Sequence, residues 1–488
     1  MLKTLLAKQP AAPYVIAAAI GASGVLCFAP FELFWLAPVV WLALFALLRR
    51  AGSPKQAALT GLSFGLGFFL TGVSWVYVSL SVFGGMPWWL AGVAAFLFCS
   101  VMALFPTLAG WIFRRWQPVE LWQQALFFAA LIAAVDWLRS WIFTGFPWLA
   151  VGYSQAPPSP LAGFAPLVGV HGLSLLVALS GALLLRWRVG LGFIALAVAG
   201  GFGLQQVQWT RPLGEPISVA LIQGNVPQEM KFRPEAFFRT LNLYRELVEQ
   251  NPAQLTLLPE TAIPAFFDQL PPGYVDTLKS TVQAHGGDLI LGTLSGDGQR
   301  YWNSAISIGS SPLQIYSKSH LVPFGEMIPP GFSWFMNIAS IPMSAFSRGP
   351  EMQSPLAVAG QQVAVNICYE DVFGEEIIRA LPTAGILANL SNTAWFGRSL
   401  AQPQHLQIAR MRTVETGRPM LRATNTGMTA VIGADGSLQA VLPPFTQGVL
   451  KAEVRAYQGM TPYAHLGNLG FLLLAGLLLL VSQWPRRR

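Results

Sequence analysis

The sequence predicts a membrane protein with two parts, a bundle of eight transmembrane α-helices and an α/β domain outside the bilayer. Of the 488 residues, 53% are hydrophobic and only 11% are charged, whereas an average soluble domain is about one quarter charged. Eight apolar stretches each approach the ~20 residues that a helix needs to cross a bilayer. Between the last two of them, strand-like apolar runs alternate with amphipathic segments, which indicates an α/β domain.

The apolar stretches set the expected domain boundaries. They cover 13–29, 33–48, 57–77, 88–113, 121–142, 167–185, 189–207 and 466–484. We therefore predict a seven-helix transmembrane domain at 1–211, an extramembrane domain at 212–462, and a C-terminal transmembrane helix with a basic tail at 463–488.

The charged residues orient the bundle and exclude one class of partner. Outside residues 212–462 there are 14 Lys and Arg, and 12 of them lie at the chain ends or in alternate connections. The positive-inside rule makes that face cytoplasmic, so we expect both termini inside and the extramembrane domain outside the cytoplasm. Residues 212–462 hold 16 basic and 19 acidic residues. The net charge of +8 therefore belongs to the membrane part, and no nucleic-acid partner is expected.

Two features of the membrane part leave alternatives open. Asp136 and Arg139 lie three residues apart on the fifth predicted helix and can pair, as functional intramembrane ions or as a structural salt bridge. The following loop, residues 143–163, is rich in aromatic residues, Gly and Pro. It either helps to admit a lipid or forms an aromatic belt at the interface.

Strands and helices alternate along the extramembrane domain. We expect strands within the segments 217–226, 255–260, 288–296, 301–309, 313–322, 362–371 and 385–392, and a hairpin at 429–442. Helices are expected at 234–250, 275–286, 374–381 and about 403–417. This order predicts an internal sheet covered by helices.

Three of these segments place chemically capable residues after strands: Glu260, Lys318 and Cys368. Sites of α/β proteins lie at such strand ends. Singly, each residue has an ordinary alternative, as a helix cap or surface carboxylate, a solvated lysine, or a packed cysteine. Together they provide a nucleophile, a base to take its proton and a cation to stabilise an oxyanion. The sequence therefore predicts acyl transfer with Cys368 as nucleophile, Glu260 as base and Lys318 as cation.

No metal or cofactor is expected. The five histidines are scattered without ligand spacing. His320 lies close to Lys318 in sequence and either assists the cysteine or is structural. Cys27 and Cys99 lie in apolar stretches, where cysteine usually packs as a small hydrophobic residue.

The segments PETAIP, SKSHLVPFGE and ICYED resemble the three signature segments of the nitrilase (carbon–nitrogen hydrolase) superfamily. The eight-span frame and the segments GFPWL, AWFG and ARMR extend the resemblance over nearly the whole chain, to the apolipoprotein N-acyltransferase family. This resemblance implies a nitrilase-like α-β-β-α sandwich domain in which Glu260, Lys318 and Cys368 are catalytic. It also implies supporting or substrate-binding roles for three further residues: Glu326, Tyr369 and Glu370.

The resemblance implies a reaction and its partners as well. Cys368 would take a fatty acyl chain from a phospholipid donor and pass it, through a thioester, to the α-amine of the diacylglyceryl-cysteine of an apolipoprotein. The enzyme would be a multi-pass protein of the bacterial inner membrane with a periplasmic catalytic domain. One complete site per chain makes a monomer sufficient. Tethering the site at the bilayer avoids exposing acyl chains to water, which costs a free energy of ~0.8 kcal/mol for each CH₂ group.

Some positions depart from the family pattern or carry two interpretations. Phe232 stands where the family often has Trp, and it keeps an aromatic surface for the substrate. Thr393 stands where Asp is common. Trp395 is a candidate substrate contact within a set of aromatic residues that form either an apolar lid or ordinary core. The set comprises Phe266, Phe267, Trp334, Phe335, Phe346, Trp395 and Phe396.

Two rival functions remain open. A membrane-anchored amidase would use the same three residues and release the acyl group to water, although eight spans exceed what an anchor needs. A non-catalytic scaffold would have no physical need for all three of Glu260, Lys318 and Cys368.

Overall fold

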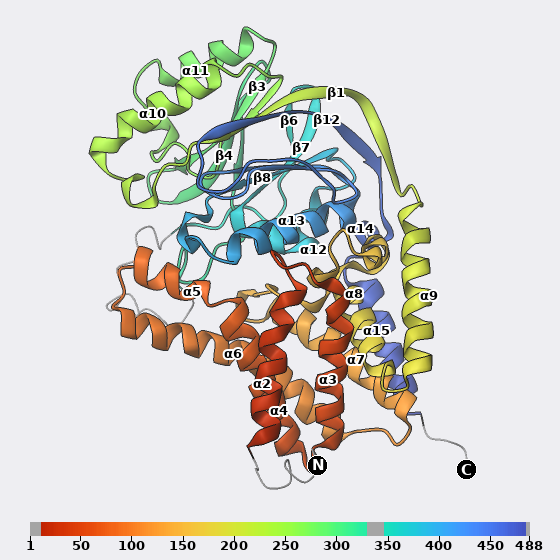
Figure 1. Cartoon of the computed structure of the whole chain (residues 1–488). Coiled ribbons are helices and arrows are strands. Elements are labelled where there is room, and N and C mark those ends of the chain that lie inside the picture. Colours follow the sequence, from red (N-terminus) through yellow and green to blue (C-terminus); the bar gives the residue numbers. More distant parts are fainter. Residues whose placement is uncertain (1–10, 329–345, 485–488) are drawn as a thin grey trace. The chain divides into compact units, whose positions relative to one another are not determined.

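The computed structural model describes residues 11–328 and 346–484. Its contacts divide the chain into two compact units. The helical unit contains Met1–Tyr77, Trp88–Val207 and Leu466–Arg488, and the α/β unit contains Val78–Pro87 and Gln208–His465. Figure 1 shows the helices and sheets of both.

The helical unit is built from apolar α-helices. They are α2 (Ala12–Gly24), α3 (Ala37–Arg50), α4 (Pro54–Gly72), α6 (Trp88–Arg115), α7 (Leu121–Arg139), α8 (Ala165–Leu183), α9 (Trp187–Gln205) and α15 (Leu469–Ser482). Glycines allow close packing between them: a Cβ on Gly67 would lie 2.0 Å from the carbonyl oxygen of Ala18. A Cβ on Gly61 would lie 2.2 Å from that of Pro106. Small residues serve this purpose in membrane bundles, where helices associate by packing.

Four helices of the described residues are long and apolar enough to span a membrane: Trp88–Arg115, Leu121–Arg139, Pro160–Leu183 and Trp187–Gln205. A fifth span results if Pro54–Gly72 and Trp75–Phe83, which are bent by 53°, count as one. The predicted number of eight is therefore not confirmed. The reason is that apolar stretches include residues outside α-helices. The first stretch ends in a 3₁₀ turn at Val25–Cys27, and the second begins with one at Phe34–Leu36.

The predicted pairing of Asp136 with Arg139 is confirmed, with Arg139 Nη2 3.0 Å from Asp136 Oδ1. Arg139 also donates to the carbonyl oxygen of Trp148. Asp136 Oδ2 accepts from the backbone N–H of Val151 and from the hydroxyl of Ser174 on α8. These bonds attach the 143–163 loop to α7 and α8. They favour the interpretation of this ion pair as a structural salt bridge.

The 143–163 loop packs largely within the helical unit. It forms 3₁₀ turns at Val151–Gln155 and Pro160–Phe164. Trp148 and Tyr153 are each only 1% exposed, whereas Phe143 is 84% exposed. Most of its aromatic surface is therefore core and does not form an exposed belt.

The α/β unit contains two six-stranded sheets. The first sheet has the order β12-β1-β2-β3-β4-β5, with β1 (Thr210–Gln223), β2 (Leu255–Leu257), β3 (Asp288–Gly296), β4 (Tyr301–Gly309), β5 (Gln314–Ser317) and β12 (Gly448–Gly459). The second has the order β11-β10-β9-β8-β7-β6, with β6 (Leu356–Val358), β7 (Gln361–Ile367), β8 (Ile386–Ser391), β9 (Met420–Thr424), β10 (Ala430–Ile432) and β11 (Leu438–Val441). The central pairs β1/β2, β2/β3, β7/β8 and β8/β9 are parallel.

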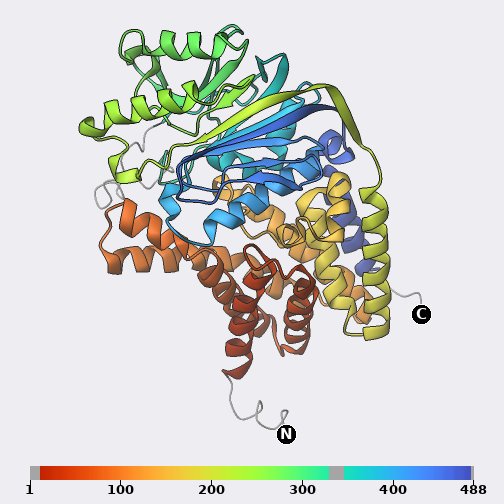
Figure 2. The same cartoon turned by 45° about the horizontal axis from the view of Figure 1, so that its top comes forward.

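Four layers make up the α/β unit. One buried apolar cluster, which includes Leu221, Leu257, Val365 and Leu390, joins the facing sides of the two sheets. The helices α10 (Pro234–Glu249) and α11 (Tyr274–Gln283) cover the outer face of the first sheet. Figure 2 shows these two helices side by side. The helices α12 (Gly374–Ile377) and α13 (Ala401–Thr416) cover the second sheet. The predicted α/β organisation is confirmed.

The first and last strands of the α/β unit lie next to each other. β1 and β12 pair antiparallel, and the register places Thr210 opposite Gly459. The longer segment of this unit, Gln208–His465, therefore begins and ends at neighbouring points of one sheet.

Candidate active site

Three buried polar side chains follow strands of the two sheets, as the sequence predicts. Lys318 follows β5 directly, Cys368 follows β7 directly, and Glu260 lies shortly after β2. Their exposed fractions are 1%, 9% and 7% respectively. The charges of Glu260 and Lys318 both act on the Cys368 thiol, so strands of both sheets deliver these groups to one buried region.

Lys318 lies between two carboxylates. Its Nζ is 2.8 Å from Glu326 Oε1 and 3.5 Å from Glu260 Oε1. The side-chain amide of Asn303, on β4, donates to both Glu260 Oε1 at 2.8 Å and Glu326 Oε1 at 3.2 Å. Burial alone would lower the pKa of Lys318, but Glu326 and Glu260 raise it above its usual value. Lys318 is therefore a fixed cation.

Glu260 is held by hydrogen bonds on both its side chain and its backbone. Its Oε2 accepts from the backbone N–H of Asn392 at 2.7 Å, while Oε1 accepts from Asn303. Its carbonyl oxygen accepts from the ammonium of Lys231 at 3.0 Å. The carboxylate is thus oriented by fixed donors, and this arrangement suits a base for proton transfer.

Cys368 begins a 3₁₀ turn, Cys368–Val372, and has a φ of 55°. This left-handed conformation is uncommon for a residue other than glycine, and such strain concentrates at functional sites. Burial, reinforced by the charge of Glu260 and opposed by Lys318, raises the pKa of Cys368 to about 12. At neutral pH the residue is therefore a thiol, which needs a base before it can attack a carbonyl carbon.

A buried polar network supports the Cys368 turn. The side-chain amide of Asn389 donates to the carbonyl oxygen of Cys368 at 3.1 Å. Arg422 Nη1 donates to Asn389 Oδ1 at 2.6 Å and to Asp371 Oδ2 at 2.8 Å. Asp371 Oδ1 lies 2.6 Å from His405 Nε2. These contacts connect α13 and β9 to the backbone of Cys368.

Glu370 joins the segments that carry Lys318 and Cys368. One oxygen accepts from the backbone N–H groups of Ser319 and His320 and from the Ser319 hydroxyl. The other accepts from the backbone N–H of Ile367 and the hydroxyl of Tyr316. The carboxylate is 2% exposed, so it acts as a clamp between two strand ends.

His320 and Tyr369 lie beside this clamp. The His320 ring stacks on Phe373, with centroids 3.7 Å apart, and its Nδ1 is 2.9 Å from Glu376 Oε1. The Tyr369 ring packs against both His320 and Phe373. These contacts favour the structural interpretation of His320.

The remaining sequence candidates differ in burial. Phe232 follows Lys231 in the chain and is 42% exposed. Trp395 is half-buried, and its ring lies 6.0 Å from that of Phe83. Thr393 is fully buried and its hydroxyl donates to Gln402 Oε1 at 2.6 Å.

Two members of the predicted aromatic set belong to a core. Phe266 and Phe346 pack around the Tyr301 ring, at centroid distances of 6.3 and 5.1 Å, together with buried Leu321. Trp334 and Phe335 lie outside the described residues.

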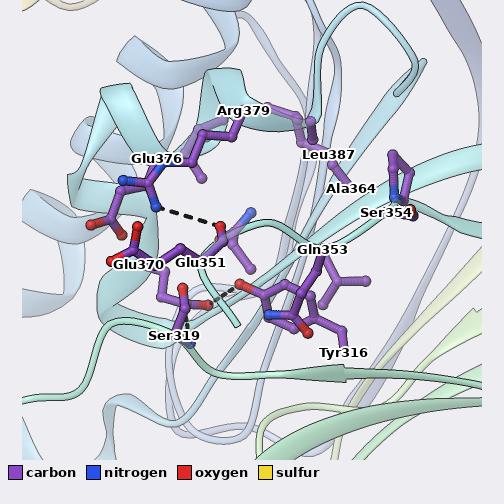
Figure 3. A pocket seen from close by; sticks show the side chains of 15 residues that line it. Tyr316, Ser319, Glu351, Gln353, Ser354, Ala364, Glu370, Glu376, Arg379 and Leu387 are labelled. Carbon is purple, nitrogen blue, oxygen red and sulfur yellow. Dashed lines mark hydrogen bonds between the residues drawn. The ribbon is translucent and has the colours of Figure 1, made fainter. Parts of the chain in front are cut away.

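A small cavity borders Glu370 (Figure 3). Its volume is about 50 Å³, and its lining includes Tyr316, Ser319, Gln353, Glu370 and Arg379. None of the three predicted reacting residues lines it. Its size suits a few water molecules and not an acyl chain. Within 11–328 and 346–484, no cluster of three or more His, Cys, Asp or Glu side chains has the arrangement of a metal site.

Comparison with known proteins shows the family of the chain. Residues 20–183 match the apolipoprotein N-acyltransferase N-terminal domain, and residues 218–462 match the carbon–nitrogen hydrolase family. The apolipoprotein N-acyltransferase of Nitrosomonas europaea is 51% identical, over 96% of each chain. That of Ralstonia nicotianae is 45% identical, over 97% of this chain and 93% of its own. The chain belongs to the apolipoprotein N-acyltransferase family.

Similar solved structures cover about half of this family member. A carbon–nitrogen hydrolase from Helicobacter pylori is 20% identical and covers 49% of this chain and 88% of its own, with a TM-score of 0.36. An amidase from Nesterenkonia is 19% identical and covers 50% of this chain and 92% of its own, with a TM-score of 0.38.

Three residues around the site of this N-acyltransferase family member escape sequence reasoning: Lys231, Asn303 and Asn392. Asn303 lies within an apolar strand. Its polar amide could have indicated a buried polar site, because a buried amide requires hydrogen-bond partners. Asn392 contributes a backbone N–H, which no side-chain pattern reveals. The partner of Lys231 is 29 residues away, so its local sequence carries no sign of its burial.

Proposed function

We propose that this chain is an N-acyltransferase that moves a fatty acyl chain from a phospholipid to the α-amine of the diacylglyceryl-cysteine of an apolipoprotein, through a thioester on Cys368. Membership of the family supports the activity and both substrate classes. The observation that carries the residue assignment is the buried cluster of Glu260, Lys318 and Glu326 acting on the Cys368 thiol.

In the first step, Glu260 takes the thiol proton and the Cys368 sulfur attacks the ester carbonyl of the phospholipid. The carbonyl oxygen becomes an oxyanion, which Lys318 stabilises as the nearby cation. Collapse of the intermediate breaks the ester bond. The protonated Glu260 returns its proton to the departing alkoxide, which leaves as a lysophospholipid, and the acyl group remains on sulfur.

In the second step, the α-amine of the lipoprotein cysteine attacks the thioester carbonyl. Lys318 again stabilises the oxyanion, and Glu260 takes a proton from the nitrogen. The C–S bond breaks as the amide forms. The Cys368 thiolate then recovers its proton from Glu260, so the site returns to its starting state.

Glu326 fixes Lys318 between two carboxylates, which supports a positioning role. Glu370 and Tyr369 support the turns that carry Lys318 and Cys368. Phe232 and Trp395 have exposed or half-buried aromatic surface, and we assign them to contacts with the acyl chains.

We further propose a multi-pass architecture in the bacterial inner membrane. It comprises seven spans in 1–211, a periplasmic catalytic domain at 212–462, and an eighth span with a cytoplasmic basic tail in 463–488. The distribution of 12 of 14 basic residues supports this orientation. The helices Ala12–Cys27 and Leu469–Ser482 are apolar, and tilted or locally thinned bilayers accommodate short spans. All proposed reacting groups come from one chain, so a monomer is sufficient.

Intact-mass spectrometry of the purified protein with phospholipid tests the proposal. We expect an acyl adduct that hydroxylamine removes, that is absent from Cys368→Ala, and that moves to the amine of an added diacylated lipopeptide. Cys99→Ala is the matched control, because Cys99 is also a buried free cysteine. An adduct released only to water would favour an amidase. An adduct that persists in Cys368→Ala would refute the nucleophile assignment.

A further inference from the structure

Lys231 is a buried ammonium beside the reacting residues that the mechanism above does not use. It follows a 3₁₀ turn, Gln228–Met230, on the connection between β1 and α10. Only 3% of its surface is exposed. Among the described residues, its Nζ has one hydrogen bond, to the carbonyl oxygen of Glu260 at 3.0 Å. A neutral donor such as an amide could make this bond, so the bond alone does not account for a buried charge.

Lys231 also interacts electrostatically with the site. Burial lowers its pKa to about 8, and the charges of Glu260 and Cys368 oppose that shift. A desolvated cation is costly unless nearby negative charge compensates it. At neutral pH the side chain remains protonated, and its compensating groups are those that exchange the catalytic proton.

Among Glu260 and the groups in direct contact with it or with Lys318, the charges balance only when Lys231 is included. Beyond this group, Arg422 is paired with Asp371, and Glu370 accepts from backbone N–H groups. Glu260 and Glu326 carry two negative charges, and Lys318 carries one positive charge. With Lys231 protonated, the four groups sum to zero. When Cys368 gives its proton to Glu260, the sum stays at zero and the negative charge moves to sulfur. Without Lys231, the thiolate would form in a buried site that already has a net negative charge, which is unfavourable at low dielectric.

We propose that Lys231 is the second cation in contact with Glu260, a positioning residue that fixes the backbone of Glu260 and, with Lys318, stabilises the Cys368 thiolate. The inference rests on the role proposed above for Cys368. Lys231 would then have two roles: its hydrogen bond positions Glu260, and its charge stabilises the thiolate. Different substitutions of Lys231 can separate the two roles.

Alkylation of Cys368 by iodoacetamide, followed at the peptide level by mass spectrometry, tests this inference without any lipid substrate. Lys231→Met removes the charge and the donor, Lys231→Gln removes only the charge, and Lys231→Arg keeps both. Lys279→Met is the matched control, because Lys279 is exposed on α11 of the same unit. Melting curves of each variant show whether it is folded.

At neutral pH we expect alkylation of the Met and Gln variants to be about tenfold slower or more, since losing an adjacent opposite charge shifts a pKa by ~1 unit or more. The Arg variant and Lys279→Met should stay close to wild type. Folded Met and Gln variants that react at the wild-type rate would overturn the inference. A folded Arg variant that reacts as slowly as the Met variant would also overturn it. In that case the shape of the lysine side chain, and not its charge, would determine the alkylation rate.

A second measurement needs only the wild type and Lys231→Arg. The alkylation rate of the wild type should rise with pH and then rise less steeply near pH 8, where Lys231 loses its proton. The Arg variant should lack this break, because arginine stays charged. Profiles of the same shape would contradict the role of Lys231. Failure of the acyl adduct to depend on Cys368, in contrast, would refute the proposed function.

Discussion

Cys368 is a thiol whose surroundings both hold its proton and prepare its removal. Burial and the charge of Glu260 raise its pKa to about 12, whereas an ordinary thiol has a pKa near ~8.5. A resting thiol is protected from oxidation and from premature alkylation, because the thiolate is the reactive form. In the proposed mechanism Glu260 therefore serves two purposes: its negative charge keeps the thiol protonated at rest, and its carboxylate accepts the proton during reaction.

A second prediction at the residue scale concerns how folding stability depends on pH through the buried His405. Burial, with a contribution from the charge of Arg422, lowers its pKa from 6.5, while Asp371 opposes the shift. The folded state therefore holds a neutral His405, and the unfolded chain binds a proton that the folded state does not. This contribution to stability is complete above pH 6.5 and is lost as the pH falls below it, at up to about 1.4 kcal/mol per pH unit.

The measurement compares melting temperatures of the detergent-solubilised protein and His405→Gln above and below pH 6.5. Wild type should lose more stability on acidification than the variant, because the glutamine does not titrate. A parallel loss in both proteins would show that His405 is not the group responsible.

At the scale of elements, Glu370 ties a strand of the first sheet to a strand of the second. It accepts from Tyr316 and Ser319, on and after β5, and from Ile367 at the end of β7. We expect Glu370→Gln to lower the free energy of unfolding by about 3 kcal/mol, because the amide NH₂ would face donors in place of an acceptor. Tyr316→Phe, which removes one donor, should cost about 1 kcal/mol.

Chemical denaturation monitored by fluorescence gives both values. The Glu370 variant should also alkylate more slowly at Cys368 when folded, because the β7 end carries the nucleophile. Equal destabilisation by the two substitutions would contradict the clamp, since one lost donor would then account for the whole effect.

The sequence predicts features that depend on one helix or strand better than features that depend on contacts between them. Strand-like runs predicted where Glu260, Lys318 and Cys368 lie, because a strand end is a local pattern that the chain preserves in three dimensions. The sequence does not predict the places of Asn303 and Lys231 in the site, because their hydrogen-bond partners lie on other segments of the chain. Apolar stretches overestimated helix length in the membrane part, since hydropathy does not distinguish a helical residue from one in an apolar turn.

At the scale of the whole molecule, the proposed orientation places Lys55 and Lys279 on opposite sides of the membrane. Both are exposed. We expect a membrane-impermeant maleimide to label Lys279→Cys in intact spheroplasts, and to label Lys55→Cys only after permeabilisation. The three native cysteines are buried, and labelling of the unsubstituted protein measures their background. Labelling of both positions before permeabilisation, with an intact cytoplasmic marker protein, would contradict the orientation.

The pairing of Thr210 with Gly459 has a consequence for the history and engineering of this fold. Paired residues of adjacent strands lie about 5 Å apart, so some 250 residues return the chain almost to its starting point. For the residues on either side of it, the segment from Thr210 to Gly459 is therefore equivalent to a short surface loop. A gene segment that encoded an independent hydrolase could therefore have been inserted between two helices without separating them. For the same reason, a short Gly-Ser connection between these positions offers a route to circularly permuted forms of the unit.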